Sequence, residues 1–298
     1  MDPRTIAVVL NPDAGGGRTL RVLPKINAEL QKLGRPYHIH VTKAPGDAIP
    51  IAKRFSEEGA SVILAVGGDG TINEVVNGIL QSERQTPLGL VPVGHGSDFA
   101  RTAGSPKDVG ECVRRAANGR GRAVDVGYVQ FNDGARRGFI NVAGLGFDTI
   151  VAEKAQRSRL PGSKLPYLAT ALPSLIRFQN FTVTIDADGE LFSTPAVFVQ
   201  IANARFMGGG MQIAPMADIA DGLLDVAIVG DFNKRELLRA LPSVYSGSHV
   251  GLAKFFHVKA RRVRVETMEP ARVQLDGELI GQAPADFTVA PGAILLAG

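Results

Sequence analysis

The segment that decides the fold is residues 61–80, SVILAVGGDGTINEVVNGIL. Its apolar run at 61–66 is typical of a strand that is buried on both faces, and it ends in the glycine turn 67–70. The run at 71–80 follows directly and predicts a helix. Ligands of open α/β sheets bind at such strand-to-helix junctions. The segment therefore predicts an α/β domain with a binding site at this turn.

The same alternation of strand and helix continues through the first part of the chain. We predict strands at 5–10, 37–41, 61–66 and 88–92, and helices at 20–33, 48–58, 71–80 and 107–118, with a helical turn from Ser97. This rhythm is typical of a Rossmann-like, mostly parallel sheet with helices on both faces.

The second half has a different pattern, in which apolar and polar residues alternate with period two. The clearest runs are 181–185 and 197–201, and shorter ones occur at 224–229, 263–265 and 272–275. They predict a mainly antiparallel β-sandwich with one helical insertion at 151–178. We place the domains at 1–124 and 125–298, with the last residues free to pack back on the first domain, and expect the site in a cleft between them.

Composition narrows the class of protein. The chain of 298 residues is 45% hydrophobic and 21% charged, which is typical of a globular protein, and its single Cys112 excludes an internal disulfide and a Cys-rich zinc site. No apolar run is long enough for a membrane span, and the N-terminus MDPRTIAVVLNP does not resemble a secretory signal, so we expect a cytoplasmic protein. A net charge of +4 favours anionic partners. The 6% aromatic content without Trp argues against nucleic acid.

Two further glycine-rich turns follow predicted strands, NPDAGGGR at 11–18 and PVGHGSDFAR at 92–101. Backbone N–H groups at such turns bind phosphate, so three of them indicate one polyphosphate ligand. Asp69 would repel a phosphate unless a cation lies between them, which suggests Mg²⁺. The alternatives are an ordinary turn at 11–18 and an Asp69 that only caps its own helix. Neither a Walker A lysine signature nor GxGxxG occurs.

An ordered series of motifs resembles the catalytic domain of diacylglycerol kinases and their bacterial relatives. The series is GGDGTINEV at 67–75, GSDFAR at 96–101, NVAGLGFD at 141–148, AP at 214–215 with DGLLDV at 221–226, and LDGE at 275–278. NAD kinases and 6-phosphofructokinases share a GGDGT turn alone, whereas the whole series is specific to the lipid kinases.

The resemblance implies an enzyme that transfers the γ-phosphoryl group of Mg-ATP to a lipid hydroxyl. Diacylglycerol is the default acceptor, and ceramide or a sphingoid base is the alternative. The rivals are an NAD kinase and an inactive nucleotide- or lipid-binding regulator. By position, the resemblance implies nucleotide contacts at Asn11, Pro12, Asp13, Ala14, Gly15, Thr42, Gly67, Gly68, Asp69, Gly70, Thr71, Asn73 and His95.

The resemblance also implies catalytic residues in both halves. Asp276 and Glu278 resemble the family's catalytic pair, with Glu278 as the general base, and Asp69 acts with them from the first domain. The alternative is that 276–278 is only a hairpin turn, as we expect for the identical residues Asp188-Gly189-Glu190.

Magnesium and one departure from the family complete the implied site. Asp218, Asp221 and the carbonyl of Leu223 resemble a structural Mg²⁺ site, and Asp69, Asp98 and Asp221 resemble a water-linked network around the ion. Relatives usually have Thr or Ser in place of His95 and Asn in place of Ser97, which leaves that nucleotide contact open.

Basic residues mixed with apolar ones occupy the insertion 151–178, and a second basic run spans 254–264. Both patterns suit an anionic membrane surface, so we expect peripheral contact with the inner face of the membrane. The alternatives are a packed helical pair with a solvated basic edge and an exposed strand face. An exposed sheet edge in the second domain would allow a homodimer.

Overall fold

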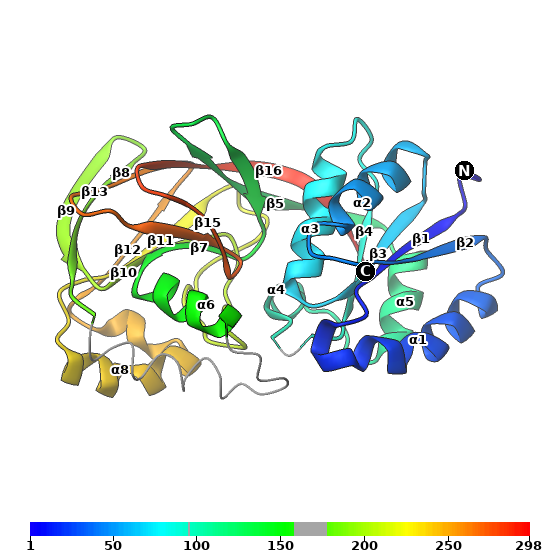
Figure 1. The fold of residues 1–298 in the computed structure, drawn as a ribbon, viewed down its shortest axis with the longest axis horizontal. Coiled ribbons are helices and arrows are strands. Elements are labelled where there is room, and N and C mark those ends of the chain that lie inside the picture. Colours follow the sequence, from blue (N-terminus) through cyan, green and yellow to red (C-terminus); the bar gives the residue numbers. More distant parts are fainter. Residues whose placement is uncertain (95, 158–177) are drawn as a thin grey trace. The chain divides into compact units, whose positions relative to one another are not determined.

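The computed structural model describes residues 1–94, 96–157 and 178–298, and Figure 1 shows the order of its helices and strands. The chain divides into two compact units, which are described separately. Unit 1 comprises Met1–Asp125 and Pro291–Gly298, and unit 2 comprises Val126–Ala290. Two strands run from one unit into the other, β5 (Gly121–Phe131) and β16 (Ala285–Ala297).

Unit 1 is built on a parallel sheet of β1 (Ile6–Leu10), β2 (Tyr37–Val41), β3 (Val62–Gly67) and β4 (Leu88–Pro92), in the order β2-β1-β3-β4. Every residue of β1 and β3 is buried, as the continuous apolar runs predict. The final residues of β16 join this sheet, where Leu296 and Ala297 pair in parallel with Leu88 and Gly89. The last part of β16 therefore completes the sheet of unit 1.

Helices cover both faces of this sheet. Figure 1 shows α2 (Ala48–Glu57) and α3 (Asp69–Leu80) on one face, and α1 (Ala14–Lys32) and α5 (Val109–Asn118) on the other. Gly78 allows α2 and α3 to pack closely, because a Cβ atom there would lie 2.3 Å from the carbonyl oxygen of Ile49. A short helix, α4 (Asp98–Thr102), follows β4.

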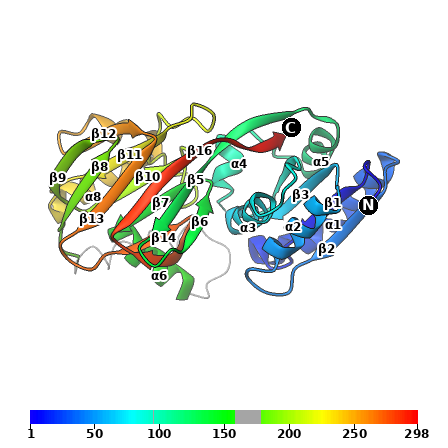
Figure 2. The ribbon, with the colours of Figure 1, turned by 90° about the horizontal axis from the view of Figure 1, so that it is seen from above.

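Unit 2 is a sandwich of antiparallel strands. One layer runs β16-β13-β8-β9, with β5 beside β16 and β6 beside β5, and the other runs β12-β11-β10-β7-β14-β15. Figure 2 shows β13, β8 and β9 side by side in the first layer. The strands not yet given are β6 (Arg136–Phe139), β7 (Val142–Gly146), β8 (Phe181–Ala187), β9 (Glu190–Ala196), β10 (Phe198–Ala202), β11 (Leu224–Val229), β12 (Phe255–Ala260), β13 (Arg262–Thr267), β14 (Arg272–Leu275) and β15 (Glu278–Gln282).

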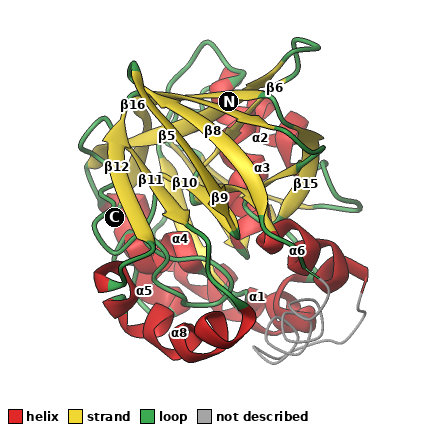
Figure 3. Ribbon diagram, turned by 90° about the vertical axis from the view of Figure 1, so that its left-hand side faces the viewer, coloured by secondary structure: helices red, strands yellow, loops and turns green. Residues whose placement is uncertain are grey.

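The core of unit 2 lies between these layers and is filled by apolar side chains from both, including Leu145, Ile201, Val263 and Phe287. Two helices, α6 (Phe147–Arg157) and α8 (Lys234–Ser246), lie against the six-stranded layer (Figure 3). A short 3-10 helix, Ser248–Gly251, follows α8.

The predicted fold class is confirmed: unit 1 is α/β with a parallel sheet, and unit 2 is an antiparallel sandwich. One predicted boundary differs, because we expected the first helix at 20–33 whereas α1 includes residues from Ala14 onward. Gly15, Gly16 and Gly17 have positive φ angles, so the regular helical part begins after them. The predicted insertion at 151–178 lies mostly outside the described residues, which include only its α6 portion and Phe178. No helix of the described ranges is long and apolar enough to cross a membrane.

Candidate functional site

The glycine turns of unit 1 lie together at the carboxyl edge of the parallel sheet. Leu10 of β1 pairs with Val66 of β3, and Gly67 of β3 pairs with Pro92 of β4, so the three strands end side by side. Backbone hydrogen bonds continue past these ends, from Asn11 N to Val66 O at 3.1 Å and from Val93 N to Gly67 O at 2.9 Å. The sheet register therefore gathers the three turns in one place.

These turns approach so closely that they require glycine. A Cβ atom on Gly15 would lie 2.3 Å from the carbonyl oxygen of Val93, and one on Gly94 would lie 2.7 Å from the Cα of Gly68. The Asn11 side chain also donates to the Thr71 hydroxyl at 3.1 Å. Backbone, rather than side chains, thus forms much of this edge, as a phosphate-binding surface needs.

Asp69 ties two of the turns together. Its carboxylate accepts the backbone N–H of Asp98 at 3.0 Å and of Phe99 at 2.9 Å, at the start of α4. Asp69 is itself the first residue of α3. The alternative that Asp69 only caps α3 does not account for these two bonds, because its carboxylate also binds the beginning of the next helix.

Most of the other residues predicted to contact a nucleotide lie in or beside these turns. Thr42 is buried and donates its N–H to Leu10 O, and Asn73 is buried in α3. Asp13 is exposed, whereas His95 lies outside the described residues. We predicted no role for Glu74, whose carboxylate accepts the N–H groups of residues 46 and 48 at the start of α2. The roles of the predicted residues in contacting a nucleotide stay predictions.

The predicted catalytic pair lies in unit 2, at the hairpin turn between β14 and β15. Asp276 and Gly277 both have positive φ angles. The Asp276 carboxylate accepts three backbone N–H groups at the start of β7, those of Ile140, Asn141 and Val142, at 2.9 to 3.0 Å. Asp276 therefore fastens the turn to β7.

Glu278, unlike Asp276, bonds a side chain rather than the backbone. Its carboxylate forms an ion pair of 2.7 Å with Arg137, and 42% of its side chain is exposed. The turn at Asp188 is also a hairpin with a positive φ angle, between β8 and β9, as expected. Asp188 likewise holds its turn by accepting the N–H groups of Arg261 and Arg262. Turn geometry thus does not separate the two Asp-Gly-Glu segments.

The predicted structural Mg²⁺ ligands lie in the loop before β11. Asp218 accepts the N–H of Ala220 and Asp221 accepts that of Leu223. The second oxygen of Asp221 bonds the Lys259 ammonium at 2.6 Å. Carboxylate and carbonyl oxygens are the donors that Mg²⁺ prefers, so the residue types fit. The described residues nevertheless contain no cluster of three or more His, Cys, Asp or Glu side chains suited to a metal.

A buried polar row that we did not predict crosses the six-stranded layer of unit 2. Gln200 of β10 and Gln274 of β14 both pair with Gly144 of β7. The Asp148 carboxylate lies over Gly144, where a Cβ atom would be only 2.0 Å from its Oδ2. Gln200 and Gln274 donate their side-chain N–H groups to that same oxygen at 2.7 and 3.1 Å. The lack of a side chain at Gly144 makes room for this arrangement.

Burial dominates the chemistry of Asp148. It raises the pKa of the carboxyl to about 6, although the hydrogen bonds from Gln200 and Gln274 act in the opposite direction. Two other oxygens of the row, Asp148 Oδ1 and Gln200 Oε1, are buried and accept no hydrogen bond of normal geometry from the described residues. Gln274 also links the row to the hairpin turn, because its Oε1 accepts the N–H of Gly277 at 2.8 Å.

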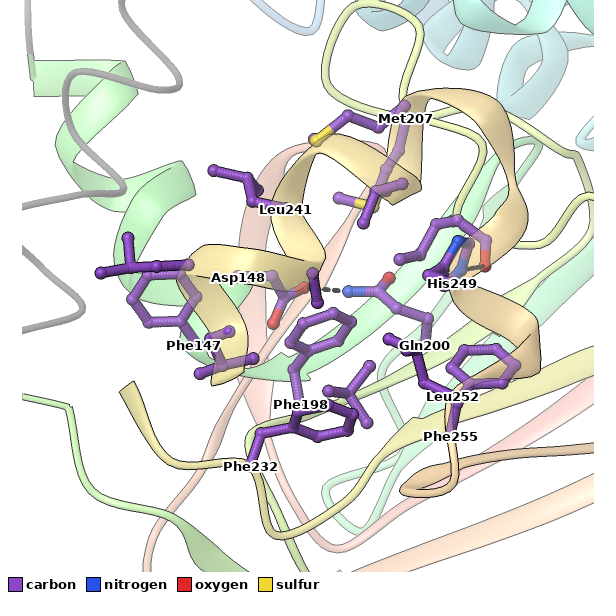
Figure 4. Close-up of a pocket in the computed structure, with 17 residues that line it drawn as sticks. Phe147, Asp148, Phe198, Gln200, Met207, Phe232, Leu241, His249, Leu252 and Phe255 are labelled. Atoms are coloured by element: carbon purple, nitrogen blue, oxygen red, sulfur yellow. Dashed lines mark hydrogen bonds between the residues drawn. The ribbon is translucent and has the colours of Figure 1, made fainter. Parts of the chain in front are cut away.

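Asp148 and Gln200 line a largely apolar pocket with a cavity volume of about 110 Å³. Figure 4 shows their hydrogen bond among surrounding aromatic and aliphatic side chains. The remaining lining residues come from several elements: Phe147, Phe198, Met207, Met211, Ile213, Val229, Phe232, Leu237, Leu238, Ala240, Leu241, Val244, His249, Leu252 and Phe255. Its walls have the apolar character of a binding site for an apolar molecule.

Two family models match successive parts of the chain. "Diacylglycerol kinase catalytic domain" matches residues 5–129, and "YegS C-terminal NAD kinase beta sandwich-like domain" matches residues 141–298. Together with the convergent turns of unit 1 and the apolar pocket of unit 2, these matches define a lipid kinase. The chain belongs to the diacylglycerol kinase family.

Individual relatives resemble the chain over nearly its whole length. It is 30% identical to a diacylglycerol kinase of Bacillus subtilis (strain 168), over 94% of this chain and 91% of the relative. It is 28% identical to a diacylglycerol kinase of Mycobacterium tuberculosis (strain ATCC 25618 / H37Rv), over 97% and 93%. A solved diacylglycerol kinase structure from Bacillus anthracis str. Sterne has a TM-score of 0.75 and 25% identity, covering 99% of this chain and 96% of that one.

Proposed function

We propose that this lipid kinase uses ATP as phosphoryl donor and diacylglycerol as acceptor. The observation that carries the ATP assignment is the convergence of three glycine turns at the carboxyl edge of the unit 1 sheet. Backbone N–H groups and helix N-termini at such an edge suit a polyphosphate. The nucleotide contacts are those predicted from the sequence, with Asp69 holding the turn after β4 in place through α4.

Glu278 is the proposed general base. Its partly exposed carboxylate takes the proton of the lipid hydroxyl, whose oxygen bonds the γ-phosphorus of ATP while the bond from that phosphorus to the β-γ bridging oxygen breaks and ADP leaves. Arg137 holds the carboxylate in one position. Asp276 is better described as a positioning residue, because its oxygens hold the turn that carries Glu278.

Mg²⁺ is the proposed metal, and when bound it neutralises charge on the phosphate oxygens. Asp218, Asp221 and the carbonyl of Leu223 are the residues that would hold the structural ion, with the Asp69, Asp98 and Asp221 network as a further prediction. The oxygen donors of these groups support the proposal.

The apolar pocket of unit 2 supports a lipid acceptor, because its walls match acyl chains. Diacylglycerol is the acceptor that the relatives' names favour. Ceramide or a sphingoid base is the second candidate, because an N–H group would satisfy the buried acceptors Asp148 Oδ1 and Gln200 Oε1. We further propose that the protein works in the cytoplasm at the inner, anionic face of the membrane. The homodimer stays a prediction.

The test is transfer of label from [γ-³²P]ATP with Mg²⁺ to mixed micelles of diacylglycerol, monoacylglycerol, ceramide or sphingosine, with NAD as the rival acceptor. Glu278→Gln is expected to lose nearly all transfer while retaining ATP binding. Glu190→Gln, in the matching position of the other Asp-Gly-Glu hairpin, is expected to keep full activity. Transfer to NAD alone would overturn the lipid acceptor, and an active Glu278→Gln variant would overturn Glu278 as the general base.

A further inference from the structure

Helix α8 is well defined at both ends yet poorly buried. Asn233 forms a capping box with Glu236 at its start, and Gly247, with a φ angle of 75°, ends it. None of its 13 residues is buried. A helix in the middle of a folded unit normally buries one face, so this exposure needs an explanation.

The explanation is that the inner face of α8 borders a cavity. Leu237, Ala240, Leu241 and Val244 recur at the spacing of one helix face, and all four line the apolar pocket. Figure 4 shows Leu241 of α8 among the side chains that surround Asp148 and Gln200. The inner face is therefore apolar in sequence but faces the pocket.

The outer face of α8 combines basic and apolar side chains. Its large exposed residues follow helical spacing and are Lys234, Arg235, Leu238, Arg239 and Tyr245, which we call the α8 stripe. The one acid of the helix, Glu236, does not offset the stripe locally, because both of its oxygens bond the Lys254 ammonium at 3.0 and 2.8 Å. A helix with cations and apolar groups on its exposed face is typical of an anionic membrane interface.

The stripe also borders the mouth of the pocket. Leu238 and Leu252 both line the pocket, yet they are 46% and 36% exposed. Side chains that face the cavity and solvent at once mark the place where the cavity opens. Arg239 follows Leu238 in α8 and is also exposed, so the helix that borders the opening carries positive charge.

We infer that α8 is the membrane-contacting element of this protein. The α8 stripe lies on an anionic lipid surface, and the acceptor lipid passes from that surface into the pocket between Leu238 and Leu252. The inference rests on the proposed function for the identity of the acceptor, but the membrane contact itself does not require catalysis. Charge complementarity selects an anionic bilayer over a neutral one as the occupant of this face.

The test measures sedimentation of the full chain with vesicles of phosphatidylcholine containing 30% phosphatidylserine, and with pure phosphatidylcholine vesicles. Arg235→Gln with Arg239→Gln is expected to weaken binding to the anionic vesicles about 30-fold, since each basic residue near such a surface contributes about 1 kcal/mol. The matched control is Arg261→Gln with Arg262→Gln, which removes the same charge from the basic run at 254–264 and should leave binding near wild type.

Activity provides the second measurement. Short-chain diacylglycerol below its micelle concentration needs no membrane, so the double variant in α8 should phosphorylate it at the wild-type rate and lose activity only on anionic vesicles. Vesicle binding that depends on Arg235 and Arg239 without transfer to any lipid supports the surface and overturns the proposed function. Unchanged binding by the α8 variant, or equal binding of wild type to both kinds of vesicle, would overturn the membrane-contact assignment of the α8 stripe. The assignment would also be overturned if the α8 variant abolished self-association of the protein instead of vesicle binding.

Discussion

Burial of the Asp148 carboxyl predicts how the stability of the folded protein depends on pH. Its pKa is raised from 3.8 to about 6 in the folded protein, so the folded state holds its proton more tightly than the unfolded state does. Stability contributed in this way is fully present below the unfolded pKa and is lost as the pH rises through the folded pKa. Relative to a variant without the ionisable group, the protein should therefore lose stability between about pH 4 and pH 6.

The magnitude follows from the size of the shift. The difference of about 2 pKa units, at about 1.4 kcal/mol per unit, corresponds to about 3 kcal/mol over the whole titration. About 2 kcal/mol of this falls between pH 4.5 and pH 8, a range that unfolding experiments reach easily. Asp148→Asn keeps an oxygen to accept from Gln200 and Gln274 but has no proton to lose.

The assay is urea unfolding of both proteins at several pH values from 4.5 to 8. The stability of Asp148→Asn relative to wild type should rise by about 2 kcal/mol across this range and level off above pH 7. Subtracting the free energy of unfolding of wild type from that of the variant at each pH removes the contribution of all other titrating groups. Asp133→Asn, on an exposed turn, is the control for a lost surface carboxylate. A difference between Asp148→Asn and wild type that does not vary with pH would refute the reasoning.

Four further outcomes are expected. Gly144→Ala should lower the free energy of unfolding by about 2 to 4 kcal/mol in urea, because its Cβ would displace the buried carboxylate of Asp148, whereas Gly251→Ala, which meets nothing within 4 Å, should change it by less than about 1. Asp276→Ala should cost about 3 kcal/mol or more by the same assay, since three buried N–H groups lose their acceptor; a cost no larger than that of an exposed Asp→Ala change would count against this role. Gly15→Ala should weaken ATP binding at least 10-fold by calorimetry, because its Cβ would push the turn after β4 away, and unchanged affinity would place the nucleotide elsewhere. Removal of divalent ions with EDTA should abolish transfer, and added Mg²⁺ should restore it.

The sequence predicted those parts of the fold that depend on residues close together in the chain. The strands β1 and β3 are short apolar runs, and each is followed by a helical pattern, so periodicity alone identifies the α/β class. The glycine segment at the start of α1 was not predicted, because three successive glycines adopt positive φ angles, which apolar spacing does not reveal.

Contacts between distant positions were not predictable in the same way. Asp69 binds the backbone of residues about 30 positions later, and a sequence pattern offers no reason to prefer that partner to its own helix. The Asp148 row is harder still, because it needs the register of β7 with both β10 and β14. The motif at 141–148 marked the segment, but only the paired strands place Gln200 and Gln274 around its carboxylate.

The last residues of β16 have a consequence for biosynthesis. Leu296 and Ala297 pair with β4, although more than 200 residues separate them from that strand. A ribosome releases β1 to β4 long before it has translated these residues, so the parallel sheet emerges with one edge of β4 still unpaired. Unit 1 can therefore reach its final hydrogen bonding only after all of unit 2 has been translated, and a chaperone that covers exposed strand edges would act during this interval.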